Sequence, residues 1–179
     1  MSGAAYPADL EHEVRLADGT IVRIRPIRPD DAAGEQAFVR ALSVESRYFR
    51  FMDSQRELSP HWLERFTRID YDREMALIAL VRESGTEVQI GVARYVILDE
   101  AKTSEFAIVV ADAWQRKGVA LHLMNDLIAA ARRHGVRSMC GEVLASNHKM
   151  HALMEQLGFV SAPNTDDPAL QRVSLRLEV

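Results

Sequence analysis

The stretch EFAIVVADAWQRKGVA, residues 105–120, contains the pattern that decides the fold. The segment from Ser104 to Val110 is predicted to be a strand, and the apolar run from Phe106 to Ala111 lies largely within it. A short turn follows, and from Val119 to His134 apolar residues recur at helical spacing. Gly135 then ends the predicted helix. A strand, a turn and a long helix in direct succession predict an α/β unit.

The turn from Gln115 to Ala120 has the features of an anion-binding site. The first N–H groups of a helix lack partners within the helix, and the helix dipole favours a negative charge beside them. Gly118 lets a ligand approach the backbone, and Arg116 and Lys117 add positive charge. These residues predict a cradle for a pyrophosphate. A glycine at a helix start is also common in turns that bind nothing, so this motif alone leaves the ligand open.

The residues on either side of this unit predict the rest of a mixed sheet. Strands are expected at Glu13 to Leu16 and at Thr20 to Arg25, joined by a turn at Asp18-Gly19. Two helix starts follow, one at Pro29-Asp30-Asp31 and one where Ser59 precedes Pro60. Further strands are expected over 75–81, 88–98, 138–144 and 173–179, and a helix over 147–157. This order predicts a single α/β (α+β) domain over residues 13–179, preceded by a flexible tail over residues 1–12.

Composition narrows the classes of function. The 179 residues fit one domain, and the formal net charge of −4 argues against a nucleic-acid partner, which a basic surface would attract. No apolar run approaches the roughly 20 residues that cross a bilayer, so no membrane partner is expected. The N-terminus lacks the pattern of a signal peptide, and the single cysteine, Cys140, permits no internal disulfide. A cytoplasmic location is therefore expected.

Two other residue types carry weaker signals. Cys140 lies in an apolar strand, where a lone cysteine is far more often a packing residue than a nucleophile. His148 and His151 are spaced i, i+3 on the last predicted helix, but no third metal ligand stands with them. No bound metal is expected.

Several of these features together resemble the GNAT superfamily of N-acetyltransferases. The family has a signature turn with the motif [Gln/Arg]-x-x-Gly-x-[Gly/Ala]. In this chain Gln115, Gly118 and Ala120 match its three defined positions. In the family this turn and its helix are followed by a strand and then by a second helix. An asparagine opens that helix and the sequence Leu-Gly-Phe ends it. Here these positions are Asn147 and residues 157–159. The resemblance spans nearly the whole chain. It implies a single mixed, mostly antiparallel sheet flanked by helices, with splayed fourth and fifth strands.

The resemblance implies acetyl-CoA as the co-substrate and suggests where it would bind. The pantetheine arm would lie between the splayed strands, with the Val109 N–H placed to polarise the acetyl carbonyl. The pyrophosphate would bind the signature turn, and Asn147 would contact the coenzyme from the other side. The cofactor-binding residues implied in this way are Val109, Val110, Ala111, Gln115, Arg116, Lys117, Gly118, Val119, Ala120 and Asn147.

The same resemblance implies a general base at Glu105, ten residues before Gln115. A lysine amine with a pKa near 10.4 is neutral in only about one molecule in 2,500 at pH 7, a handicap of roughly 4.6 kcal/mol that a nearby base removes. Many relatives carry a tyrosine acid seven residues after the helix-opening asparagine, where this chain has Met154. The general acid is left unassigned, because a thiol with a pKa near 8.5 can leave as thiolate with little help.

A narrower resemblance concerns the acceptor. Residues 24–31, 46–51 and 72–77, IRPIRPDD, SRYFRF and DREMAL, look like the acetyltransferase domain of bacterial protein-lysine acetyltransferases, which modify acyl-CoA synthetases. The implied function is direct acetyl transfer to a protein lysine in a ternary complex, and a homodimer is expected because GNAT relatives often form one. Two alternatives stay open: a small amine such as a polyamine, amino acid or drug as acceptor, and a non-catalytic acyl-CoA sensor.

Overall fold

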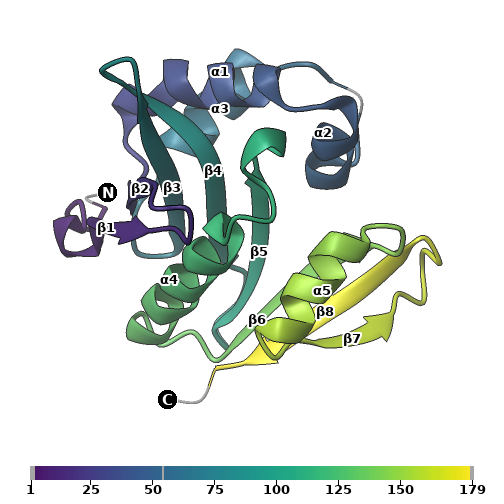
Figure 1. Cartoon of the computed structure of the whole chain (residues 1–179). Helices are drawn as coiled ribbons and strands as arrows, with labels where there is room; N and C mark the ends of the chain where they lie inside the picture. Colours follow the sequence, from purple (N-terminus) through teal and green to yellow (C-terminus); the bar gives the residue numbers. More distant parts are fainter. Residues whose placement is uncertain (1–2, 54, 178–179) are drawn as a thin grey trace.

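An eight-stranded sheet forms the centre of the structure, a computed structural model that describes residues 3–53 and 55–177 (Figure 1). Its strands are β1 (His12–Arg15), β2 (Ile21–Pro26), β3 (Glu74–Glu83), β4 (Thr86–Ile97), β5 (Thr103–Val110), β6 (Ser138–Leu144), β7 (Val160–Pro163) and β8 (Leu170–Arg176). They follow the order β1-β2-β3-β4-β5-β6-β8-β7. The described neighbours pair antiparallel, apart from β5 and β6, which are parallel because a helix crosses between them. The predicted mixed, mostly antiparallel sheet is confirmed.

β5 and β6 part soon after they pair. Among the described residues their parallel pairing runs only from Thr103↔Ser138 to Glu105↔Cys140. Beyond this point the two strands diverge, and Figure 1 shows the upper part of β5 well separated from β6. The facing edges of the two strands therefore share no ladder of hydrogen bonds there. The predicted splay of the two strands is confirmed, and it leaves backbone groups of β5 available to a ligand.

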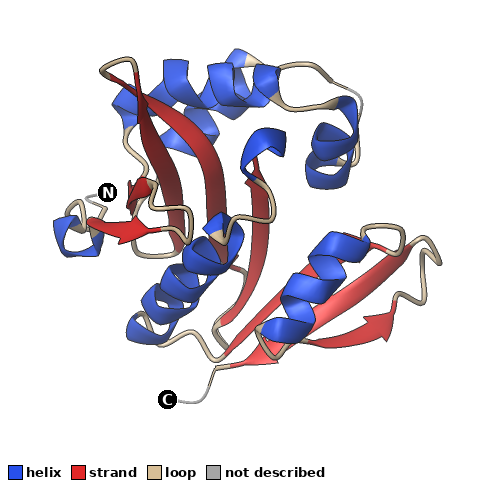
Figure 2. Ribbon diagram, in the orientation of Figure 1, coloured by secondary structure: helices blue, strands red, loops and turns tan. Residues whose placement is uncertain are grey.

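Helices cover both faces of the sheet (Figure 2). The first face carries α1 (Ala32–Ala41), α2 (Val44–Phe51) and α3 (Pro60–Thr67), and the second carries α4 (Val119–Arg133) and α5 (His148–Gln156). Three 3-10 turns, η1 (Ala8–Leu10), η2 (Pro29–Asp31) and η3 (Asp112–Trp114), complete the chain. β5 contributes to both cores. Phe106, Ile108 and Val110 pack on the α4 face, whereas Val109 packs on the α1 face.

Two elements go beyond the sequence prediction. The helix α2 begins after Ser43, whose hydroxyl accepts the Ser46 N–H at 3.1 Å. Its apolar residues lie partly on an exposed face, so the sequence lacks the buried apolar stripe that would predict this helix. The strand β7 is short and exposed along its length, and it forms by pairing with β8. β8 itself begins at Leu170, before the predicted start at Val173, while residues 178–179 of the predicted strand lie outside the described residues.

The N-terminal segment lies against the sheet. Of the expected tail, residues 1–2 lie outside the described part of the chain. The Ala4 N–H donates to the Asp70 carbonyl at 3.0 Å, and the Tyr6 hydroxyl donates to a Glu11 carboxylate oxygen at 2.7 Å. Glu11 also pairs with Arg23 at 2.9 Å. The described residues before β1 therefore make specific contacts with the domain.

Candidate active site

The splay between β5 and β6 opens into a cavity of about 720 Å³. A cavity of this size is typical of a small-molecule or cofactor site. Its walls come from the end of β5, the turn before α4 and the start of α4, one side of α5 along its length, and α2. The lining residues are Glu45, Ser46, Phe49, Arg50, Ile108, Val109, Val110, Trp114, Gln115, Arg116, Gly118, Ala120, Leu121, Ser146, Asn147, His148, Lys149, Met150, Ala152, Leu153 and Gln156.

The cavity gathers most of the residues that the sequence proposed for coenzyme binding. Those that line it are Val109, Val110, Gln115, Arg116, Gly118, Ala120 and Asn147. Three others are not part of the wall. Val119 is a core residue, and the Ala111 N–H donates to the Ile90 carbonyl at 2.7 Å. The Lys117 amine lies 4.9 Å from the centre of the Trp114 ring and 3.9 Å from an Asp18 carboxylate oxygen.

The turn before α4 presents unpartnered N–H groups to the cavity. α4 begins at Val119 without a hydrogen bond from a capping side chain. Gly118, at φ +90°, and Arg116, at φ +61°, both take left-handed backbone conformations. An added Cβ at Gly118 would meet no atom within 4 Å, so the backbone angle, not space, requires glycine. Consecutive N–H groups in such a turn, followed by a helix start, form an anion-binding concavity.

The direction of the β5 backbone corrects the expected role of the Val109 N–H. The Ala111 N–H points to β4, where it donates to Ile90, and β4 pairs with β5 in one uninterrupted register. N–H groups of alternate residues point to the same side of a strand, so the Val109 N–H also points to β4. The N–H groups of Ile108 and Val110 face the splay. These two, and not Val109, are the β5 donors open to a ligand.

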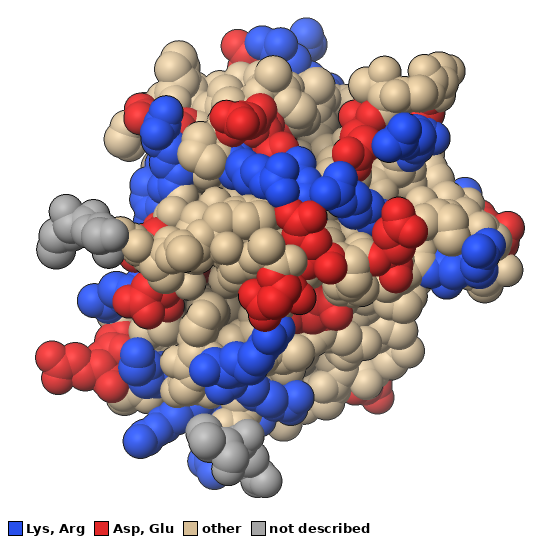
Figure 3. Space-filling view, turned by 90° about the vertical axis from the view of Figure 1, so that its left-hand side faces the viewer, with Lys and Arg blue, Asp and Glu red and all other residues tan. Residues whose placement is uncertain are grey.

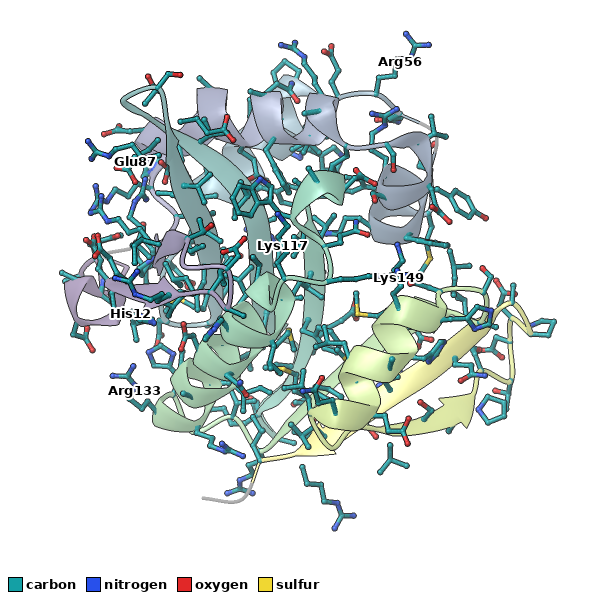
Figure 4. All side chains as sticks on the ribbon, viewed as in Figure 1. His12, Arg56, Glu87, Lys117, Arg133 and Lys149 are labelled. Atoms are coloured by element: carbon teal, nitrogen blue, oxygen red, sulfur yellow. The ribbon has the colours of Figure 1, made fainter. Side chains whose placement is uncertain are left out.

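Gln115 connects the walls of the cavity. Its amide nitrogen donates to the Val110 carbonyl at 3.1 Å and to the Ser46 hydroxyl at 3.2 Å. Its amide oxygen accepts from the Lys149 amine at 3.1 Å, and Figure 4 shows Lys149 extending from α5 toward this turn. Gln115 therefore links β5, α2 and α5 around the mouth of the cavity.

The start of α2 is fastened to the same turn through Asp112. One carboxylate oxygen of Asp112 accepts the hydroxyls of Ser43 and Ser46 at 2.6 and 2.8 Å, and the other accepts the Ser43 N–H at 2.9 Å. Burial raises the pKa of Asp112, but the hydrogen bonds from the two serines outweigh it and lower the pKa. Sequence reasoning missed Ser46, Lys149 and the whole of α2. The Ser43 cap was the available signal for α2.

A second cavity, of about 50 Å³, continues the first at the closed end of the splay. It shares Phe49, Arg50, Ile108, Asn147 and Met150 with the larger cavity, so the two adjoin. Its other lining residues are Met52, Phe106, Ala107, Glu142 and Val143. The small cavity therefore carries one carboxylate, Glu142, and one guanidinium, Arg50.

Glu105 lies at the apex of the splay and lines neither cavity. It pairs with Val96 on one side and with Cys140 on the other, and its side chain is exposed. Its side chain is on the same sheet face as those of Ala107 and Val109, the face that α2 covers. Glu105 is near enough to Arg50 to raise the pKa of that guanidinium.

Asn147, Cys140 and Met154 have structural roles. The Asn147 amide oxygen accepts the Met150 N–H at 3.2 Å and so caps α5. Met154, in the position of the family tyrosine, is fully buried. Burial raises the pKa of the Cys140 thiol, which opposes thiolate formation at neutral pH. Within the described residues no three side chains of metal-ligating type are grouped.

Comparisons with known proteins agree with this geometry. The sequence model of the acetyltransferase (GNAT) family matches residues 36–159. The chain is 40% identical over 167 residues to acetyltransferase PA5475 of Pseudomonas aeruginosa, covering 93% of this chain and 90% of that protein. It is 31% identical over 124 residues to the ribosomal protein bS18-alanine N-acetyltransferase of Escherichia coli, covering 68% of this chain and 74% of that enzyme.

A solved structure extends the agreement to the fold. The GNAT domain of S. lividans PAT superposes with a TM-score of 0.88 at 32% identity, covering 97% of this chain and 100% of that one. A match of this extent includes both strands of the splay and the turn before α4. The chain therefore belongs to the acetyltransferase (GNAT) family and is an acyl-CoA-dependent N-acetyltransferase.

Proposed function

We propose that this enzyme transfers acetyl from acetyl-CoA to a lysine side chain of a protein, by direct attack in a ternary complex with Glu105 as general base. The observation that carries the proposal is the pair of adjoining cavities along the splay. The larger one has the length of open β5 edge and the anion-binding turn that a coenzyme needs. The smaller one meets it at Ile108, where the thioester would lie.

The coenzyme is proposed to lie along β5. Its pyrophosphate would accept N–H groups of the turn at Gly118, with Arg116 and Lys149 adding positive charge. Its pantetheine arm would pair with the open N–H of Val110, and the open N–H of Ile108 would polarise the acetyl carbonyl. A backbone donor fixed in a strand needs no reorganisation as negative charge develops on that oxygen.

A protein acceptor is supported by the surface beside the small cavity. Val44 and Tyr48 lie one turn apart on α2, and Met52 directly follows its last residue; the three are 69, 47 and 42% exposed. Met52 also lines the small cavity, so this apolar face adjoins the acceptor entrance. The Escherichia coli relative acts, by its name, on a ribosomal protein. A small cationic acceptor such as a polyamine fits less well, because Arg50 places a positive charge in the entrance.

The general base is proposed from position and charge. Glu105 is three residues before Ile108, or about 10 Å along an extended strand, so one or more waters would relay the proton. Glu142 is a second carboxylate on the same face, and it lines the small cavity. Its oxygens accept from Asn164 at 3.1 Å and from Arg172 at 3.3 Å, and these contacts hold the carboxylate in place.

The experiment follows thiol release from acetyl-CoA with lysine peptides and candidate acyl-CoA synthetases as acceptors. Glu105→Gln is expected to lower kcat by about 10²–10⁴ at neutral pH, with KM for acetyl-CoA unchanged. Glu83→Gln, an exposed carboxylate on the hairpin between β3 and β4, is the matched control. Full activity in Glu105→Gln with loss in Glu142→Gln would transfer the base to Glu142. No release with any amine would refute transfer to an amine.

We propose a cytoplasmic enzyme without nucleic-acid or membrane partners, and a homodimer stays a prediction. On the face in Figure 3 the cationic and anionic side chains are interspersed and form no continuous basic field. In the part of the chain that the structure describes, no helix is both long and apolar enough to cross a bilayer.

A further inference from the structure

Arg50 is a half-buried cation that lies over aromatic rings. Its guanidinium is 4.7 and 5.8 Å from the centres of the Phe51 and Phe66 rings, and among the described residues no carboxylate forms an ion pair with it. Arg94 also lies over the Phe66 ring, at 4.3 Å, and donates to the Phe66 carbonyl at 3.2 Å. Two guanidinium groups thus share one aromatic ring beneath α2.

Nearby charges act on Arg50 in both directions. Burial first, and then the charge of Arg94, lower the pKa of Arg50 to about 10, against the opposing effect of the Glu35 and Glu105 carboxylates. Arg50 is therefore still protonated at neutral pH. Glu35 already accepts from the Gln89 amide at 2.5 Å. A partly desolvated cation without a paired anion is unfavourable, so the site is suited to a ligand that brings one.

The position of Arg50 identifies which ligand this is. Arg50 lines both cavities and adjoins Ile108, so it lies at the reacting end of the splay. The phosphates of the coenzyme belong at the other end, beside Gly118. Glu142 lines the same small cavity, and its carboxylate suits an ammonium group. Opposite charges in one small cavity fit an acceptor that carries an amine and an acid group close together.

We propose that Arg50 binds a carboxylate of the acceptor, so that the preferred acceptor amine has an acidic group within one or two residues of it. This inference rests on the proposed transfer to an amine. It names a chemistry with two sources, a protein lysine beside an aspartate or glutamate, and a free amino acid. A guanidinium binds a carboxylate through two parallel hydrogen bonds, which an ammonium cannot reproduce.

The test compares matched acceptors. One pair of peptides differs only in Glu or Gln next to the lysine, and a second pair is an amino acid and its amide. Within the pair that the wild-type enzyme acetylates, the acidic acceptor is expected to have a KM about 10- to 100-fold lower than that of the neutral acceptor. This ratio corresponds to the usual strength of a charged hydrogen bond. In Arg50→Gln that preference is expected to disappear, so that the acidic and the neutral member have similar KM values.

The controls separate this role from others. Arg56→Gln removes an exposed cation that points away from the cavities in Figure 4, and it should keep the preference. Arg50→Lys keeps the positive charge but not the two parallel N–H donors of the guanidinium. It should therefore keep only part of the preference for the acidic acceptor. Equal KM values for both members of both pairs would overturn the inference and leave amine transfer intact. An equal fall in kcat for every acceptor in Arg50→Gln would also overturn it, by assigning Arg50 to the thioester. Turnover of no amine would refute both proposals.

Discussion

Gly141→Ala tests how closely β6 approaches the core beside the splay. A Cβ built on Gly141 would lie 2.8, 3.1 and 3.2 Å from three atoms of the Phe106 ring. Favourable carbon contacts begin at about 3.5 Å, so the ring must move by several tenths of an ångström. Phe106 cannot move freely, because it packs against Phe159 at 5.2 Å between ring centres and is 7% exposed. The ring must therefore shift inside a filled core.

The cost follows from this geometry. Overpacking of a core costs about 1–3 kcal/mol, and replacing a strand glycine returns about 0.5–1 kcal/mol through the unfolded chain. The midpoints of these ranges leave a net loss of about 1 kcal/mol of unfolding free energy. At roughly 2–4 °C per kcal/mol for a protein of this size, Tm should fall by about 2–4 °C. Thermal unfolding followed by circular dichroism measures the change.

Gly34→Ala is the matched control. Gly34 lies inside α1, and a Cβ built there would meet no atom within 4 Å. The same substitution should therefore stabilise the protein by about 0.5–1 kcal/mol through helix propensity. An unchanged or raised Tm for Gly141→Ala would refute the close approach of Phe106 to β6. A fall in Tm for Gly34→Ala would refute the description of open space around α1.

Three further predictions concern the turn, the N-terminal network and the thiol. Gly118→Ala should weaken coenzyme binding by calorimetry without a steric clash, because the φ of +90° strains alanine by about 1–2 kcal/mol; unchanged affinity would contradict this. Hydrogen bonds from Tyr6, then Arg23, lower the pKa of Glu11 from 4.5 to about 2, so this stabilisation is complete above pH 4.5 and is lost as pH falls toward 2. Glu11→Gln should flatten that part of the dependence of unfolding free energy on pH, and an unaltered slope would contradict it. Cys140 should react with iodoacetamide at pH 7.5 more slowly than glutathione does, because burial raises its pKa, and equal rates would contradict this.

The elements with strong local signals were predictable. Asp18-Gly19 forms the turn between β1 and β2, and Ser59 accepts the Trp62 N–H as the cap of α3. The predicted stripe of α4 is largely buried, with Met124 and Leu127 fully covered. These features arise from neighbouring residues, so a single sequence contains them. Their order along the chain was enough for the mixed sheet.

The elements with weak local signals, α2 and β7, were not predictable from the sequence. α2 exposes Val44 and Tyr48, and its side chains that line the cavity include Ser46 and Arg50. Its position depends on Asp112, which is 66 residues away from Ser46 in the chain. β7 exists because β8 offers an edge to pair with. Long-range hydrogen bonds of this kind leave no periodic trace in the sequence.

The sequence by itself determined the turn at Gly118, the strand before it and the helix after it, because backbone angles, apolar spacing and helix starts are local properties. The tertiary structure alone decided which backbone N–H groups of β5 face the splay. The direction of the N–H groups of Ile108 and Val110 follows from the register of β5 against β4, which is a relation between strands. The meeting of Arg50 with Glu142 at one cavity follows from the packing of α2 over the splay, where residues far apart in the chain are brought together.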